Sequence, residues 1–184
     1  MFLLSLVWLV LSVTEMPQQK DTVFAGNAGN VRFISDAQLE HIEAATDQLA
    51  GAVNGTSREV FFSLSVVSFH GFNSGLQSEH FNENYLESDL FPVATFKGKI
   101  IDDIDLMQNG AFEVRVKGLL TIHGVTVERI ISGKVVINGT TMKIESTFPV
   151  LLADHNITIP KIVEMKIARQ VTVMVNMTLI RNKS

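Results

Sequence analysis

Apolar and polar residues alternate along most of the chain from Val31 onward, and a period of two residues is typical of β-strands. Between Phe112 and Ile122 the even-numbered positions are apolar or glycine, and most odd-numbered positions are charged or polar. Residues 171–179 alternate in the same way. Each of these segments predicts a strand with one dry face and one wet face.

Turn signals separate further strands. Asn-Gly pairs begin at Asn54, Asn109 and Asn138, and this pair is typical of tight hairpin turns. Residues 39–44 and 48–53 are compatible either with helix or with two short strands. Additional strands are predicted over residues 31–35, 58–69, 93–102 and 125–138, the last with a bend or bulge near Ser132 and Gly133. A further strand is predicted from Met142 to Phe148, before a connection over 149–159.

One segment changes to a helical period. Residues 76–87 place Phe81 and Tyr85 on one face of a helix, and we expect a cap near Asn73 or Ser74. A helix in an otherwise all-β chain can cover the mouth of a barrel. Its apolar residues then either plug the core or line the entrance to an apolar pocket, where polar groups would orient the head of a ligand.

About eight strands, closely spaced hairpins and one short helix predict an all-β fold, an eight-stranded antiparallel β-barrel with the helix near its mouth. A β-sandwich is the competing architecture. The interior of an eight-stranded barrel is just wide enough to be filled by side chains or to hold one ligand. Composition alone does not decide whether the interior is filled by side chains or holds a ligand.

The N-terminal segment differs from the rest. Residues 1–13 are apolar but shorter than the roughly 20 residues that cross a bilayer, and they have the length of a signal-peptide core. No Lys or Arg precedes Lys20, so we expect a truncated signal peptide over residues 1–16, with a membrane anchor or a buried segment as alternatives. A linker over residues 17–28 and a barrel domain over residues 29–184 complete the predicted organisation.

Composition narrows the classes of function. The 184 residues suffice for one domain, and 46% of them are apolar while 18% are charged, which indicates more apolar surface than one core needs. The net charge of -4 and the lack of clustered Lys and Arg argue against nucleic-acid binding. The chain has no cysteine, which excludes disulfides, thiolate nucleophiles and Cys-ligated metals.

The motifs give little support to catalysis. The five histidines are scattered, and the sequence contains no nucleophile elbow, phosphate loop or dinucleotide fingerprint. The acidic cluster Asp102, Asp103 and Asp105 lacks an EF-hand pattern, so we interpret it as a solvated loop. We therefore expect no metal, no cofactor and no catalytic residues, and a protein that is not an enzyme.

Two segments resemble a known family. His80–Ser88 followed by Phe91–Gly98 is similar to the "H-F… Y/F-P-x-A-x-F" stretch of the YceI-like family. Gly118–Thr126, with the sequence GLLTIHGVT, is similar to that family's "G-x-L-T-I-H-G-V-T" motif. The two motifs stand in the expected order, and the predicted strands from residue 31 to residue 179 are compatible with the family.

The resemblance implies an extended lipocalin-like barrel that holds a polyisoprenoid or related amphiphile in its lumen. It also implies export, so we expect a periplasmic or secreted protein. His123 belongs to the second motif, and we expect it to have a structural role beside the turn at Gly124 rather than to contact ligand.

The sequence thus leads to a protein that binds, sequesters or transports an apolar chain-like ligand, such as a polyisoprenoid, a quinone or a related lipid. The alternatives are a structural or stress-related interaction protein whose barrel is filled by its own side chains, and an enzyme acting on a lipid. The expected partner is a hydrophobic small molecule; association with a membrane surface and a homodimer are further expectations. The candidate ligand-binding residues are Phe33, Phe81, Tyr85, Phe96, Phe112, Val114, Val116, Leu120, Met142, Ile144, Phe148, Val173, Val175 and Met177.

Overall fold

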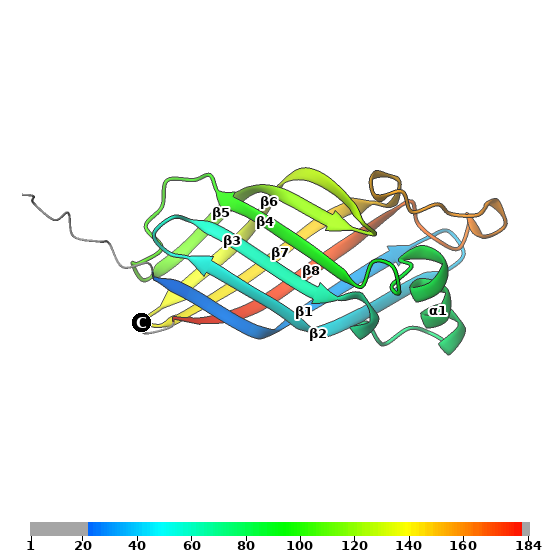
Figure 1. Cartoon of the computed structure of the whole chain (residues 1–184), viewed down its shortest axis with the longest axis horizontal. Helices are drawn as coiled ribbons and strands as arrows, with labels where there is room; N and C mark the ends of the chain where they lie inside the picture. The colour runs from blue at the N-terminus through cyan, green and yellow to red at the C-terminus, as the bar shows by residue number, and fades with distance from the viewer. Residues whose placement is uncertain (1–21, 182–184) are drawn as a thin grey trace, which may run out of the picture.

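The described part of the chain, residues 22–181, forms eight antiparallel strands, each paired with the next along the chain, and the last returns to pair with the first (Figure 1). The predicted closed β-barrel is therefore confirmed. The computed structural model describes residues 22–181. The strands are β1 (Val23–Asp36), β2 (His41–Asn54), β3 (Glu59–Ser65), β4 (Val93–Ile100), β5 (Gly110–Ile122), β6 (Val125–Asn138), β7 (Thr141–Leu151) and β8 (Gln170–Arg181).

Short helices lie at one end of the barrel. The predicted helix forms as α1 (Gly75–His80) and continues as a π-helical turn, η2 (Phe81–Tyr85). Ser74 caps α1, because its hydroxyl accepts a hydrogen bond from the Gln77 amide at 3.2 Å. The 3₁₀ turns are η1 (Val66–Ser68), η3 (Leu152–His155) and η4 (Lys161–Val163).

The predicted start of the barrel is wrong. β1 begins at Val23, inside the range 17–28 that we assigned to a linker, and Phe24 is fully buried. This stretch, rich in Gly and Asn, has little intrinsic strand preference. Pairing with β2 on one side and β8 on the other nevertheless makes it a strand, with register shifts on both sides. The predicted signal peptide and residues 17–21 lie outside the described residues.

Other boundaries also differ from the prediction. The two ambiguous segments at 39–53 form one continuous strand, β2, and β3 ends at Ser65, where η1 begins. β6 pairs with β5 over its whole length without a register shift, so no bulge at Ser132 and Gly133 interrupts that ladder. β7 extends to Leu151, into the predicted connection.

The two ends of the barrel differ. At the closed end, the loop between β4 and β5 places Leu106 against Phe24, Met142 and Leu179, and all four side chains are fully buried. At the opposite end, which carries α1, neighbouring strands separate (Figure 1). β3 pairs with only four residues of β2, and the β6–β7 ladder stops at the Gly133–Ser146 pair. This end is the mouth of the barrel.

Within the described part of the chain, residues 22–181, no helix is long and apolar enough to cross a bilayer.

Candidate functional site

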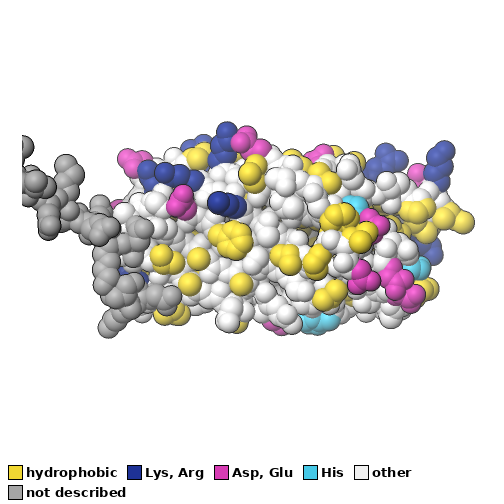
Figure 2. Space-filling view, viewed as in Figure 1, with side chains coloured by type: hydrophobic (Ala, Val, Ile, Leu, Met, Phe, Trp, Pro, Cys, Tyr) yellow, Lys and Arg dark blue, Asp and Glu magenta, His cyan; other side chains and the backbone are white. Residues whose placement is uncertain are grey.

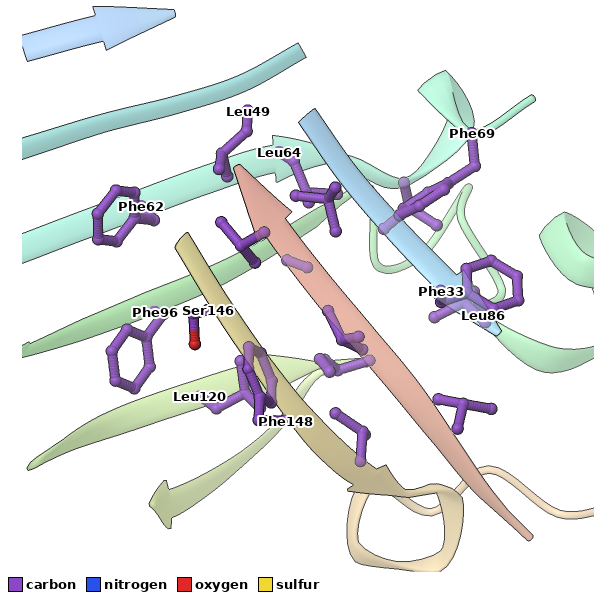
Figure 3. A pocket seen from close by; sticks show the side chains of 18 of the residues that line it. Phe33, Leu49, Phe62, Leu64, Phe69, Leu86, Phe96, Leu120, Ser146 and Phe148 are labelled. Atoms are coloured by element: carbon purple, nitrogen blue, oxygen red, sulfur yellow. The ribbon is translucent and has the colours of Figure 1, made fainter. Parts of the chain in front are cut away.

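A cavity of about 550 Å³ opens at the mouth and runs along the lumen, lined by inward side chains of all eight strands (Figure 3). It extends inward as far as Val53, Ile100 and Met142, which separate it from the packed closed end. Its walls are almost entirely aliphatic and aromatic side chains. The lumen is therefore hollow at the mouth and solid at the opposite end.

Small residues at inward positions create this space. Ala94 on β4 stands opposite Leu64, and Gly133 on β6 pairs with Ser146 on β7. All four line the cavity. Ala94 and Ser146 have side chains too short to reach the opposite wall, and Gly133 has none. The Ser146 hydroxyl donates a hydrogen bond to the Ser132 carbonyl at 2.7 Å, so it remains satisfied among apolar neighbours.

Four phenylalanines join the helical segment to the barrel at the mouth. The ring of Phe81 on η2 stacks on that of Phe33 on β1, with centroids 5.4 Å apart and planes 9° apart. Phe69 and Phe72 pack on the same two rings at centroid distances of 5.1 to 6.1 Å. Such contacts fix the helical segment over the opening, because aromatic pairs gain energy from both burial and ring geometry.

Polar groups in the wall gather near the mouth. Gln77 on α1 donates a hydrogen bond to Glu40 in the β1–β2 turn, and Lys166 lies in the loop before β8. Tyr85, the only tyrosine in the chain, also lines the cavity. Burial raises the pKa of the Tyr85 phenol above its usual value, which favours the neutral hydroxyl. The mouth can thus offer hydrogen bonds to a ligand head, whereas the interior offers apolar contact.

Twelve of the fourteen candidate residues line the cavity. From the mouth inward these include Phe33, Phe81 and Tyr85; the others are Phe96, Val114, Val116, Leu120, Met142, Ile144, Phe148, Val173 and Val175. Phe112 and Met177 also belong to the apolar core, but they pack with the closed end and do not line the cavity. The inward parity predicted for β1, β4, β5, β7 and β8 therefore agrees with the structure, but parity does not say how deep in the barrel a residue lies.

Sequence reasoning missed the wall formed by β2 and β3. Leu49, Val53, Phe62 and Leu64 line the cavity, as does Phe69 just beyond η1 (Figure 3). The predicted strand runs to residue 69, and Phe61, Val67 and Phe69 make that longer segment apolar at both parities, so its inward face was not identified. A usable signal is Gly51: a Cβ there would lie 2.3 Å from the Phe62 ring, so this glycine marks where that ring packs against β2.

His123 has contacts that fit the expected structural role. Its Nε2 lies 2.6 Å from a Glu87 carboxylate oxygen, beyond the helical segment, and its Nδ1 lies 3.0 Å from the His155 carbonyl in η3. Phe91 packs its edge on the His123 ring, with centroids 4.8 Å apart. His123 therefore links the helical segment, the β5–β6 turn and η3, and it is not among the residues that line the cavity.

The acidic cluster lies at the other end, in the β4–β5 loop. The side chain of Arg115 donates hydrogen bonds to Asp102 and holds the pKa of that carboxyl below its usual range. Asp103 accepts a hydrogen bond from Arg58 at 3.0 Å. Among residues 22–181, no group of three His, Asp or Glu side chains is placed to hold a metal ion.

Comparison with protein-family models matches residues 23–179 to the YceI-like domain. Among solved structures, a polyisoprenoid-binding domain from Saccharophagus degradans implicated in plant cell wall breakdown superposes with a TM-score of 0.74 at 15% identity, covering 89% of this chain and 100% of that one. BcnA of Burkholderia cenocepacia gives 0.68 at 18% identity over 82% of this chain and 95% of that one. The YCEI protein of Campylobacter jejuni gives 0.55 at 11% identity over 98% and 94%. A search of the curated proteins found no significant match.

Proposed function

The chain belongs to the YceI-like domain family, and from this premise we propose that it binds a polyisoprenoid, quinone or related lipid in its lumen and stores or carries it. One structural relative is described as a polyisoprenoid-binding domain, which supports this class of ligand. At such low sequence identities, the likeness to that relative and the others shows the fold alone. The ligand class proposed for this chain therefore rests on its own cavity.

The observation that carries the proposal is the hollow apolar lumen of the barrel. A barrel filled by its own side chains would leave no space of about 550 Å³ behind a single mouth. Water gains few hydrogen bonds from walls such as Phe96, Leu120 and Phe148, so an apolar ligand is the favoured occupant. The cavity therefore favours ligand binding over a purely structural role.

The size of the cavity suits a chain-like ligand. The cavity volume of about 550 Å³ is many times the roughly 30 Å³ that one water molecule takes in the liquid, so the cavity has room for an extended chain. Each buried methylene contributes about 0.8 kcal/mol, and association costs on the order of 4–15 kcal/mol. A chain that fills the cavity thus offsets this cost, and a chain of a few carbons does not.

Polar groups at the mouth suit a polar ligand head that remains near the entrance. The Glu40–Gln77 pair, Tyr85 and Lys166 provide both donors and acceptors there. We propose that the tail enters the lumen first and the head stops beside α1. We further propose a binding protein without catalytic activity that works in the periplasm or outside the cell.

The test is native mass spectrometry of freshly purified protein, followed by organic extraction of any bound lipid. We expect a co-purified prenyl lipid, or uptake of a short-chain prenyl quinone added to ligand-free protein. Protein that is empty after mild purification, and that also fails to take up the quinone, would contradict the proposal.

A matched pair of variants locates the binding site. Ala94→Trp places a large ring in the lumen and should lower uptake at least tenfold. Leu119→Trp adds the same ring on the outer face of β5, where Leu119 is exposed, and should leave uptake unchanged. Thermal unfolding of both proteins checks that each is folded, and equal uptake by the two would argue against a luminal site.

A further inference from the structure

Exposed apolar side chains surround the mouth on the outside. Ile162 is 92% exposed at the tip of the loop before β8, residues 160–169, and Met165 in the same loop is 45% exposed. Leu39 in the β1–β2 turn and Leu76 on α1 are 64% and 58% exposed. These four side chains come from three segments that meet at one end of the molecule, so they form a single apolar rim.

Of the three segments of this rim, the loop 160–169 carries the positive charge, because the β1–β2 turn holds Glu40 and α1 holds Glu79. The loop 160–169 carries Lys161, Lys166 and Arg169 against one carboxylate, Glu164, so its net charge is +2, whereas the chain as a whole has -4. Figure 2 shows hydrophobic and basic side chains together at the right-hand tip of the molecule, where Figure 1 places this loop. Acidic side chains gather instead over α1, on the other side of the mouth.

The loop is fixed to the barrel and faces two ways. The Leu39 amide donates to the Met165 carbonyl at 2.9 Å, and the Ala168 amide donates to the buried Ser35 hydroxyl at 2.9 Å. Val163 and Ile167 line the cavity, while Ile162 and Met165 are exposed to solvent. The same ten residues thus form part of the wall of the lumen and an apolar surface just outside it.

We propose that the loop 160–169 docks the mouth of the barrel on the surface of an anionic phospholipid bilayer. Ile162 and Met165 would enter the interface, and Lys161 with Arg169 would lie at the level of the anionic headgroups. The acidic face of α1 would tilt away from the surface. The reason for such docking rests on the proposed function, because a prenyl chain could then pass between the bilayer and the lumen without crossing water.

A second copy of the chain fits this surface less well. A symmetric dimer whose two-fold axis passes through the loop would bring two loops of net charge +2 together. Like charges at such an interface oppose association, whereas an anionic bilayer attracts them. The bilayer is therefore the occupant that the charge pattern favours.

The test is flotation of the full chain with vesicles of phosphatidylcholine alone or of an equal mixture of phosphatidylcholine and phosphatidylglycerol. We expect binding to the anionic vesicles to be at least tenfold stronger and to weaken as salt is added. The double variant Ile162→Asp, Met165→Asp should lose at least tenfold of that binding. Every protein compared carries the same N-terminal segment, so its own affinity for vesicles cancels.

The matched control is Ile130→Asp, which changes a side chain of β6 that is 60% exposed on the barrel wall. Thr126→Asp, on the same strand, measures the effect of one added negative charge on vesicle binding. Ile130→Asp should weaken vesicle binding by no more than Thr126→Asp does. Equal losses in the control and the double variant would overturn the proposal. So would wild-type protein that floats equally with both vesicle types, or that sediments as a dimer which the double variant breaks.

A parallel measurement separates this proposal from the luminal one. Uptake of a short-chain prenyl quinone from solution should be the same in the double variant and the wild type, because neither Ile162 nor Met165 lines the cavity. Uptake without vesicle binding by the wild type would overturn the docking proposal alone. Vesicle binding without uptake would overturn the luminal proposal alone.

Discussion

Phe24, Leu106 and Met142 fill the barrel at its closed end, whereas Ala94 and Ser146 occupy inward positions nearer the mouth and leave the interior hollow. Both ends use strands with the same alternation of inward and outward side chains. The difference lies in the volume of the inward side chains and in what covers each end. One barrel can thus combine a packed core that stabilises the fold with a cavity that the fold does not need.

The two ends of the barrel are also covered differently. The β4–β5 loop seals the closed end by burying Leu106 completely. The mouth is covered only in part, by a helical segment fixed through the Phe33–Phe81 stack and through His123. We therefore expect global stability to depend mainly on the closed end, and access to the lumen to depend on contacts at the mouth.

The largest expected effect comes from truncating one phenylalanine at each end. Phe24→Ala should lower the free energy of unfolding by about 3–5 kcal/mol, because it empties a filled core. Phe148→Ala should cost less than about 2 kcal/mol, because that ring already borders a cavity and has fewer packing partners to lose. Urea unfolding measures both, and equal losses would contradict the division between the two ends.

A smaller effect should follow from loosening the mouth. His123→Ala removes the contacts to Glu87 and His155, with an expected loss of about 1–2 kcal/mol because the carboxylate is partly exposed. Amide hydrogen exchange should accelerate in residues 81–91 and stay unchanged around Phe24. His41→Ala, at an exposed ring, is the control. Uniform acceleration along the chain would show that the two ends open together.

The smallest effect concerns the titration of Tyr85. Burial raises the pKa of its phenol above 10.0, so the neutral form contributes stability that is complete below pH 10.0 and is lost as the pH rises through the folded value. A ligand that fills the lumen should bury the ring further and raise this pKa again. Near-UV absorbance of the phenolate follows the change, and Tyr85→Phe removes the signal. An unchanged titration with saturating ligand would place the ligand away from the mouth.

The regular half of the barrel could be predicted closely. β5 and β6 have one polar and one apolar face, so alternation gave their bounds within two residues and identified Val114, Val116 and Leu120 as inward. The N-terminal half was harder. β1 is rich in Gly and Asn at its start, β2 has a composition that also suits helix, and β3 ends earlier than the apolar run to Phe69 suggests.

Sequence by itself determined an all-β chain of about eight strands, the helical segment and most of the residues that face inward on the alternating strands, because side-chain parity is a local property of a strand. Only the tertiary structure decided where the barrel is solid and where it is hollow. That outcome depends on how side chains from different strands meet at one depth, as Gly133 and Ser146 do, and on which loop covers each end. Register between strands and the packing of loops are long-range properties, so alternation along the chain does not contain them.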